Sequence, residues 1–389
     1  MDSQAISLVR SSFKSIVAEE GGPEQLARTF YSLLFARSPE TREFFPAAMD
    51  VQRDRLFTAI GYVVDSLDES DEMLEYLAQL GRDHRKYGVT DEHYNDVANS
   101  MIEAFEMFGG AEMWTDEVDS AWRNTLSVIS AAMTGAANAA DGPRAWTATV
   151  VESRAVIKGV AIVRLQLDQP MDYRPGQYVS VQVAARPRMW RYLSPANPVD
   201  GSGIVEFHIR QVSGGWVSPP MVNQTAVGDT WVIGSPIGAL GLPDNIRDLL
   251  MIASGTGLAP FRAQILELIR RGNTRRVHLF YSGQYPCDLY DLPFLWTLAE
   301  KHSWLTVIPV SEEGSNPWWH TNPEPLPPLG FPERITGKVG KVVTSYGTWP
   351  GHDIQLVGNE SMVNSTKFRL RAAGIDVATV RSDPTYGVQ

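Results

Sequence analysis

The chain has 389 residues, of which 43% are apolar, and its formal net charge is −11. At roughly 150 residues per domain, this length predicts two or three domains. No run of Lys and Arg appears, which argues against a nucleic-acid partner or an anionic membrane surface, because both require a basic face. The single cysteine, Cys287, leaves no second thiol for an intramolecular disulfide. The first residues lack the pattern of a secretory signal, and no apolar run approaches the roughly 20 residues that span a bilayer, so we expect a soluble cytoplasmic protein.

Residues 1–140 carry apolar side chains at helical spacing. Six amphipathic helices are expected, with apolar stripes that begin at Ile6, Leu26, Leu56, Leu74, Tyr94 and Val118. The segment 139–143 (Ala-Ala-Asp-Gly-Pro) then interrupts this pattern. The first 140 residues are therefore predicted to form an all-α domain.

The period changes twice in the rest of the chain, which indicates two more domains. Residues 141–246 contain short runs with a period of two, separated by Gly/Pro turns, which predicts an antiparallel β-barrel; the runs are 146–151, 160–167, 178–183 and 204–212. In residues 247–389, buried strands alternate with helices, as in an α/β Rossmann-like domain with a parallel sheet. A Pro-rich loop, 312–334, carries Trp318 and Trp319 and is expected to be a lid or a mobile insertion.

His84 is the first candidate for a functional side chain in the helical domain. It follows Leu77 and Leu80 on the apolar face of its helix, and a neutral imidazole in such surroundings is what an axial iron ligand requires. A single core histidine is more often structural, so this observation is weak by itself. His93 is a poorer candidate, because it lies among charged residues at the start of the next helix.

Further residues suit a pocket for a diatomic ligand. Gln52 and Leu56 lie one helical turn apart on one face, and Tyr31 and Phe45 precede them. The segments Thr-Phe-Tyr-Ser-Leu-Leu-Phe (29–35), Phe-Phe-Pro (44–46) and Gln-Arg-Asp-Arg-Leu-Phe (52–57), with His84 before His93-Tyr94, resemble the globin domain of bacterial flavohaemoglobins in order and spacing. The resemblance implies the following roles: Tyr31 as the distal tyrosine that hydrogen-bonds oxygen, Gln52 as the distal glutamine, Leu56 above the haem, Phe45 packed on the porphyrin, and His84 as the proximal ligand.

The sequence departs from this family on the proximal side of the haem. In the better-known members a Tyr and a Glu brace the proximal histidine and raise its electron donation. Tyr94 matches the tyrosine, but alignment on Trp122 places Ala137 at the glutamate position. The loss is characteristic of a branch often called type II, and it makes peroxide-like chemistry and fast dioxygenase turnover a weaker expectation.

The segment Arg191-Tyr192-Leu193-Ser194 is the informative part of the barrel. A flavin site needs a cation for its diphosphate and a hydroxyl near the reactive ring nitrogen. Following the run 174–178 (Arg-Pro-Gly-Gln-Tyr), this segment resembles the FAD domain of the ferredoxin-reductase superfamily. The resemblance implies that Arg191 binds the diphosphate, that Ser194 approaches the flavin nitrogen and that Tyr178 packs on the cofactor.

Two features qualify this flavin site. The turn 214–218 matches the family's next phosphate-binding turn, to which Gly214, Gly215, Val217 and Ser218 belong. The tyrosine of the family's Arg-x-Tyr-Ser motif is Leu193 here, and Tyr192 points to the opposite face of a regular strand. Trp190 is the candidate for compensation.

The segment Ser-Gly-Thr-Gly-Leu-Ala-Pro (254–260) follows a strand and opens a helix, where glycines let phosphates approach the backbone. It resembles the pyridine-nucleotide lobe of the same superfamily. The resemblance implies a nicotinamide cofactor held by Gly255, Thr256, Gly257 and Pro260, with Gly358 in a late turn that lacks the family's cysteine. No Arg follows Ser282-Gly283-Gln284, and Asp288 and Asp291 would repel a 2′-phosphate, which favours NADH over NADPH. Tyr386 is a candidate to cover the flavin.

The resemblance implies that electrons pass from NADH to FAD to haem b and that the protein oxidises nitric oxide (NO) to nitrate with O2. Ala137, Leu193 and the Gly358-Asn359 turn favour an alternative oxidoreductase with another electron donor, such as a hydroxy acid, or another oxidised substrate. A second alternative is a haem-based gas sensor or carrier. It requires an output segment, which the sequence does not show, and the sequence identifies no partner protein.

Overall fold

The computed structural model describes residues 2–382, which form two compact units. The first comprises the residues up to Ala145 with two short segments, 187–189 and 233–237. The second comprises the remaining residues and carries the two sheets. No helix in the described part of the chain is long and apolar enough to cross a membrane.

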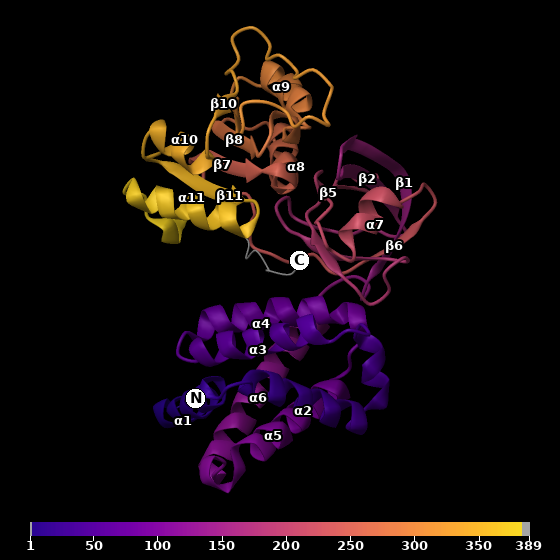
Figure 1. Ribbon diagram of the computed structural model, residues 1–389, viewed down its shortest axis with the longest axis vertical. Coiled ribbons are helices and arrows are strands. Elements are labelled where there is room, and N and C mark those ends of the chain that lie inside the picture. The colour runs from indigo at the N-terminus through magenta and orange to yellow at the C-terminus, as the bar shows by residue number, and fades with distance from the viewer. Residues whose placement is uncertain (1, 383–389) are drawn as a thin grey trace. The chain divides into compact units, whose positions relative to one another are not determined.

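The first unit is a helical bundle, coloured indigo to magenta in Figure 1. Its described α-helices are α1 (Ser3–Ala18), α2 (Gly22–Arg37), α3 (Asp50–Asp65), α4 (Ser70–His84), α5 (Asp91–Met113) and α6 (Asp116–Ala139). Helix α1 begins at a cap in which the Asp2 carboxylate accepts from the Ala5 N–H, as the first turn of a helix requires. The predicted all-α domain is confirmed.

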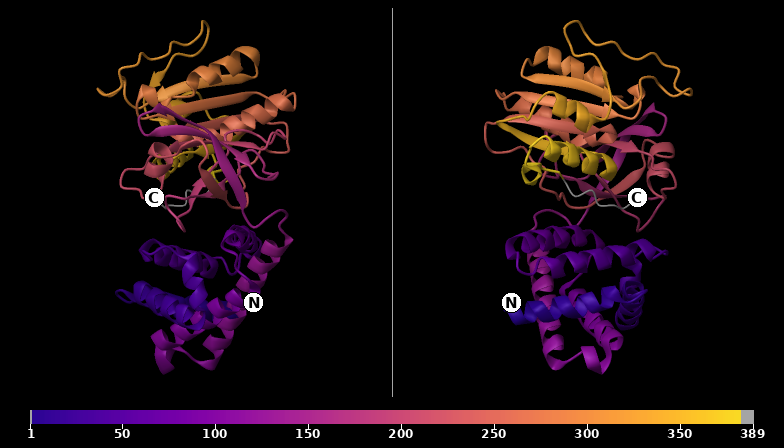
Figure 2. Two further views of the ribbon diagram at one scale, coloured as in Figure 1. Left: turned by 90° about the vertical axis from the view of Figure 1, so that its right-hand side faces the viewer. Right: turned by 60° about the vertical axis from the view of Figure 1, so that its left-hand side comes forward.

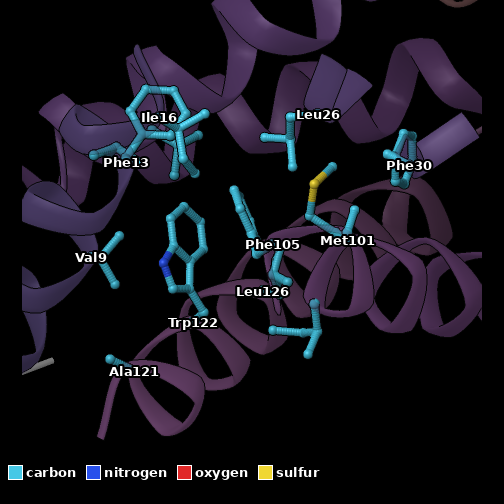
Figure 3. Packing of buried hydrophobic residues seen from close by; sticks show 14 of the residues in the cluster. Val9, Phe13, Ile16, Leu26, Phe30, Met101, Phe105, Ala121, Trp122 and Leu126 are labelled. Atoms are coloured by element: carbon cyan, nitrogen blue, oxygen red, sulfur yellow. The ribbon is translucent and has the colours of Figure 1, made fainter. Parts of the chain in front are cut away.

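Trp122 of α6 lies at the centre of the helical core, between α1 and α5 (Figure 3). Its ring centroid lies 4.2 Å from that of Phe105, and its Nε1 donates to the Ser12 hydroxyl at 2.9 Å. The indole therefore keeps its hydrogen bond while it fills the core. In α4 the inward face begins at Met73 instead of the expected Leu74: Met73 and Leu77 are buried, while Leu74 is 41% exposed.

The first sheet of the second unit is a nearly closed antiparallel barrel. Its described strands are β1 (Trp146–Ile157), β2 (Val160–Leu167), β3 (Val179–Val183), β4 (Arg191–Leu193), β5 (Ile204–Arg210) and β6 (Thr230–Ile233), in the order β4-β3-β6-β1-β2-β5. A bridge between Pro195 and Phe207 brings the two end strands together. A short helix, α7 (Ser218–Asn223), follows β5. The predicted barrel is confirmed.

The second sheet is parallel, with helices on both faces (Figure 2). Its described strands are β7 (Asp248–Ser254), β8 (Val277–Gly283), β9 (Leu305–Ser311), β10 (Ile335–Thr336) and β11 (His352–Val357), in the order β10-β9-β8-β7-β11. Helices α8 (Leu258–Arg270) and α9 (Leu292–Lys301) share one core with the sheet, and α10 (Val339–Ser345) and α11 (Glu360–Ala372) share the other. The predicted α/β domain is confirmed.

The loop 312–334 contains neither helix nor strand, but its ends are anchored. The Glu312 N–H donates to the Gly283 carbonyl at 3.0 Å, and Arg334 donates to the Gly314 carbonyl at 3.0 Å. The Lys158 ammonium lies 5.3 Å from the ring centroid of Trp319. These contacts hold the loop beside the carboxyl end of β8 and the β1–β2 turn.

Candidate functional site

His84 is the last residue of α4, and its ring is oriented by a hydrogen bond from within its own helix. Its Nδ1 lies 2.7 Å from the Leu80 carbonyl oxygen, so Nδ1 carries the proton and Nε2 keeps its lone pair. Burial lowers the pKa of His84, which favours the neutral imidazole. A neutral histidine with a free Nε2 is the form that binds iron.

Tyr31 of α2 stands in an aromatic cluster next to the first turn of α3. Its hydroxyl donates to the Gln52 carbonyl oxygen at 3.4 Å, and its ring meets Phe45 edge to face with centroids 5.4 Å apart. Burial raises the pKa of Tyr31 far above its ordinary value, so the hydroxyl remains a donor. Three of the residues expected on the distal side thus lie together.

Helices α3 and α4 carry the residues that the sequence predicts on either side of a haem. Helix α3 packs against α1 and α2, and α4 packs against α6, while α3 and α4 meet through Tyr62 and Tyr76, whose ring centroids lie 4.5 Å apart. Leu56 on α3 and Leu80 and His84 on α4 are partly exposed, although the two leucines border the helical core. Partly exposed apolar side chains of this kind suit contact with a flat, largely apolar porphyrin.

Tyr94 of α5 has a buried hydroxyl that finds no hydrogen-bond partner among residues 2–382. Burial raises the pKa of Tyr94 to about 12. The ring lines a groove of about 450 Å³ between α5 and α6, together with Ser130 and Thr134, whereas Ala137 does not line it. No acid follows Asp119 in α6, so the carboxylate partner expected from the family is absent at any register.

His93 belongs to the start of α5 rather than to the pocket. Its Nδ1 accepts from the Thr90 N–H at 3.0 Å, and its ring lies edge to face on Phe44 with centroids 5.2 Å apart. It thus acts as a helix cap, in agreement with the sequence, which made it a poorer candidate than His84 for an iron ligand.

Arg191 and Ser194 lie at the open end of the barrel, where β4 approaches β5. Strand β4 ends at Leu193, so Ser194 follows the strand and does not belong to it. An isolated antiparallel bridge joins Pro195, two residues after β4, to Phe207 of β5. The segment that carries Arg191 and Ser194 thus approaches β5, which leads into a glycine turn.

That turn, residues 212–218, is closed on itself. The Gly215 N–H donates to the Val212 carbonyl at 3.0 Å, and the Val212 N–H donates to the Ser218 hydroxyl at 3.0 Å. Gly214 has φ +74, which only glycine adopts readily, and Val217 is fully buried. In a turn held in this way, glycines without side chains let a diphosphate approach the backbone N–H groups.

Leu193 stands where the family's motif has a tyrosine, and the neighbouring Tyr192 contacts another tyrosine of the barrel. Leu193 pairs with Val179 and Tyr192 pairs with Ser180, so the two side chains point to opposite faces, as expected. The Tyr192 ring instead meets Tyr178 edge to face, with centroids 5.2 Å apart. Tyr178 is 5% exposed and Tyr192 is 37% exposed, so Tyr192 offers more surface to a flavin than Tyr178 does.

The glycine turn after β7 is in backbone contact with the turn after β11. A Cβ added to Gly257 would lie 2.7 Å from the Val357 carbonyl oxygen and 3.2 Å from the Gly358 nitrogen. Thr256 belongs to the same turn, and Pro260 lies in the first turn of α8, where its missing N–H costs nothing. Two bare turns at the carboxyl ends of adjacent parallel strands form the usual binding edge of such a sheet.

Arg210 is a candidate that the sequence did not reveal. It ends β5 of the barrel, and a Cβ added to Gly255 would lie 3.2 Å from its Nη2, so the guanidinium lies against the glycine turn of the other lobe. Its Nη2 donates to the Asp288 carboxylate at 3.1 Å. The second carboxylate oxygen of Asp288 accepts from the N–H groups of Gln284 and Tyr285, at 3.0 Å each.

These contacts correct the argument for NADH. Asp288 and Asp291 are 7% and 9% exposed and are paired with Arg210 and Arg262, so neither presents a free negative charge to a 2′-phosphate. The preference for NADH then depends on the lack of a cation in the segment 282–284. Tyr386, the expected cover of the flavin, lies outside the described residues.

Three family models match consecutive parts of the chain. They are the globin at residues 28–133, the oxidoreductase FAD-binding domain at residues 147–241 and the oxidoreductase NAD-binding domain at residues 251–322. The chain thus joins a globin domain to the FAD- and NAD-binding domains of an oxidoreductase.

The chain is similar in sequence to proteins of phenol-oxidising systems. The reductase component of phenol 2-monooxygenase from Pseudomonas sp. (strain CF600) is 33% identical over 178 residues, which are 45% of this chain and 49% of that protein. The phenol hydroxylase P5 protein of Acinetobacter pittii (strain PHEA-2) is 30% identical over 57% of this chain and 60% of its own length. The chain thus spans about half to three fifths of these relatives.

One solved structure matches nearly the whole chain. It is a flavohemoglobin from Malassezia yamatoensis, crystallised with FAD and heme, which has a TM-score of 0.77 at 16% identity and aligns over 98% of both chains. The order of domains and the fold of this protein are those of a flavohaemoglobin.

Proposed function

We propose that this protein is an NADH-dependent oxidoreductase that passes electrons through FAD to haem b and oxidises NO to nitrate with O2, as a nitric oxide dioxygenase. One observation carries the proposal: a neutral histidine, whose Nδ1 is held by its own helix, and a buried tyrosine that stays protonated stand in a globin domain of the same chain as a flavin reductase fold. When bound, FAD accepts a hydride from NADH and releases electrons singly, and haem iron supplies the site of oxygen chemistry.

The residues of the helical unit would hold the haem and its gas ligand. His84 would bind the iron through Nε2, with the Leu80 carbonyl fixing the ring. Tyr31 would donate a hydrogen bond on the distal side, and Gln52 and Phe45 would border the ligand. Tyr31 is 5% exposed, and burial of its hydroxyl would strengthen the hydrogen bond that it donates.

The residues of the second unit would hold the two dinucleotides. Arg191 and the turn 212–218 would bind the flavin diphosphate, with Ser194 and Tyr192 near the ring. The glycine turn after β7 and Gly358 would bind NADH, and Arg210 would pair with its diphosphate.

The test mixes the protein with NADH without oxygen and then adds O2 and NO. Each NO that becomes nitrate requires one electron, so the proposal predicts two NO consumed for each NADH oxidised. NADH oxidation that does not rise above background on addition of NO would contradict the dioxygenase activity. Haem that NADH reduces in the first step would still support the electron path, and would argue against a gas sensor or carrier.

A second candidate keeps the electron path and changes the donor or the oxidised substrate. The Tyr94 hydroxyl, which has no hydrogen-bond partner among the described residues, and the lack of an acid after Asp119 in α6 favour it, because the proximal histidine then receives less support than in the better-known flavohaemoglobins. The relatives also belong to systems that oxidise other substrates than NO. Flavin reduction by NADH, NADPH and 2-hydroxy acids, compared without oxygen, separates the two candidates.

A further inference from the structure

Arg262 is a buried cation at the junction of the barrel and the parallel sheet. Its side chain is 9% exposed, and its guanidinium lies 4.3 Å from the ring centroid of Phe294. Nη1 donates to the Ala196 carbonyl at 2.8 Å and lies 2.8 Å from a Glu206 carboxylate oxygen. Nε lies 3.0 Å from the Asp291 carboxylate.

These contacts join the two dinucleotide sites. Ala196 lies two residues after Ser194, in the loop that is expected to meet the flavin. Arg262 lies in α8, five residues after Gly257 of the nicotinamide turn. One side chain thus connects the flavin loop of the barrel with the helix that begins at the nicotinamide turn.

The flavin loop depends on strand β5 as well. The Ala196 N–H donates to the Glu206 carbonyl at 2.8 Å, and the Glu206 N–H donates to the Asn197 side chain at 2.8 Å. The Glu206 carboxylate receives Arg262 on one oxygen and Arg164 on the other, at 2.6 Å. The backbone of Glu206 therefore holds the flavin loop by hydrogen bonds, and its carboxylate binds Arg262, which contacts the same loop at the Ala196 carbonyl.

Two more groups complete this buried network. His208 Nε2 lies 3.0 Å from the Glu206 carboxylate, and His208 Nδ1 lies 2.9 Å from the Tyr290 hydroxyl of the other lobe. The attraction of these partners lowers the pKa of Glu206 to about 2, although burial opposes ionisation. The carboxylate is therefore charged at neutral pH, and Arg262 has a fixed anion to bind.

Stability alone is a poor reason for such a network. Replacing a buried ion pair with apolar groups of similar volume is often neutral or stabilising, since desolvation offsets the attraction. A planar guanidinium, however, holds three partners in one geometry, which a flexible ammonium cannot reproduce. The other large side chains at the start of α8, Leu258 and Phe261, are apolar and fully buried, so Arg262 is a charged side chain among apolar neighbours.

We propose that Arg262 is a positioning residue for hydride transfer, which holds the flavin loop at a fixed distance from the nicotinamide turn. The inference rests on the proposed reduction of FAD by NADH. In that step the C–H bond of the nicotinamide breaks, a bond from hydride to the flavin nitrogen forms, and two electrons leave NADH with the hydride. Arg262 exchanges neither proton nor electron. Misplacement of reacting groups by about 1 Å can reduce such a rate by about 100-fold.

The test is stopped-flow reduction of the flavin by NADH without oxygen, in wild type, Arg262→Lys and Arg271→Lys. Arg271 is the matched control, because it lies at the end of the same helix, is 62% exposed and pairs, among the described carboxylates, with Glu267. We expect Arg262→Lys to lower the limiting rate by at least about tenfold, to change the dissociation constant of NADH little, and to enlarge the isotope effect with 4-deuterated NADH. Arg271→Lys should match wild type in all three.

The outcomes separate this inference from the proposed function. If NADH fails to reduce the wild-type flavin, the proposed function is contradicted and the positioning role with it. If NADH reduces wild type and Arg262→Lys at the same limiting rate, or if only the dissociation constant rises, the positioning role alone is overturned. If Arg262→Lys retains no FAD, Asp291→Asn decides, because it removes one of the partners of Arg262 and leaves Ala196 and Glu206 in place; an unchanged limiting rate in that variant overturns the role.

Discussion

His84 and His93 differ in what holds their rings, and the difference predicts which of them binds haem. The Leu80 carbonyl fixes the Nδ1 of His84, whereas the Nδ1 of His93 accepts from the Thr90 N–H. We expect His84→Ala to lose the haem Soret band and to keep its flavin absorbance and its reduction of ferricyanide by NADH. His93→Ala is the control, and it should lose only about 1 kcal/mol of stability with its helix cap. A haem that survives in His84→Ala and is lost in His93→Ala would reverse the assignment.

The ionised Glu206 carboxylate makes the free energy of unfolding of the barrel depend on pH. Its pKa is lowered to about 2 in the folded protein, so the carboxylate stabilises the fold above its ordinary pKa, and this contribution is lost as the pH falls from about 4.5 towards 2. The full effect is up to about 3 kcal/mol for a shift of this size. Glu206→Gln should unfold in less urea at pH 7, because Arg262 is left partly unpaired, and should lose less stability than wild type as the pH falls from about 5 to about 3. Glu152→Gln, at an exposed partner of Arg164, should keep the wild-type slope. Equal slopes in Glu206→Gln and wild type would contradict the shift.

At the scale of elements, the contact between the turns after β7 and β11 leaves no room for a side chain at Gly257. The nearest atom to an added Cβ is a backbone oxygen at 2.7 Å, which cannot move aside as a side chain can. We expect Gly257→Ala to raise the KM for NADH about tenfold or more and to keep FAD, because overpacking of about 1–3 kcal/mol displaces the turn. Gly314→Ala is the control, since an added Cβ there meets nothing within 4 Å. An unchanged KM in Gly257→Ala would show that the turn does not contact NADH.

The elements themselves were largely predictable, because each has one dominant period. Helical spacing predicted the helical domain, and the alternation after Pro143 predicted β1. Helix α8 begins at Leu258, within the segment 254–260 that was expected to open it, since proline is tolerated in the first turn. The first residue of the buried stripe in α4 was predicted wrongly, because Met73 and Leu74 are adjacent apolar residues and only packing decides which one is buried.

The contacts between elements were not predictable in the same way. Arg210 and Asp288 are 78 residues apart, and Arg262 and Ala196 are 66 residues apart, so no local period joins them. The one available signal was a charged residue within an apolar run: Arg262 follows Leu-Ala-Pro-Phe, and Arg210 ends a buried strand. Site residues from local motifs were therefore expected from the sequence, whereas those that connect the two lobes of the reductase were not.

At the scale of the whole molecule, the chain divides into two compact units, each with its own core. The globin model matches within the first unit, the NAD model matches within the second, and the FAD model matches in the second except for the segments 187–189 and 233–237. A ligand stabilises only the unit that binds it, by about 2.7 kcal/mol at a concentration of 100 times its dissociation constant. FAD and haem are therefore expected to stabilise different parts of the same chain.

Thermal unfolding tests whether FAD and haem stabilise different units. The full chain is first freed of FAD, and its unfolding is then recorded as FAD is added back. We expect two transitions, of which added FAD raises only one, by roughly 5–10 °C for a unit of about 150–250 residues. The Soret band should report the transition that does not move, because His84 and Tyr31 lie in the first unit. FMN, which lacks the second phosphate and the adenosine, is the control and should shift the midpoint less, since it cannot complete the diphosphate contact at the turn 212–218. A Soret transition that moves with FAD as far as the other transition would mean that the two units unfold together, and that haem and flavin share one cooperative structure.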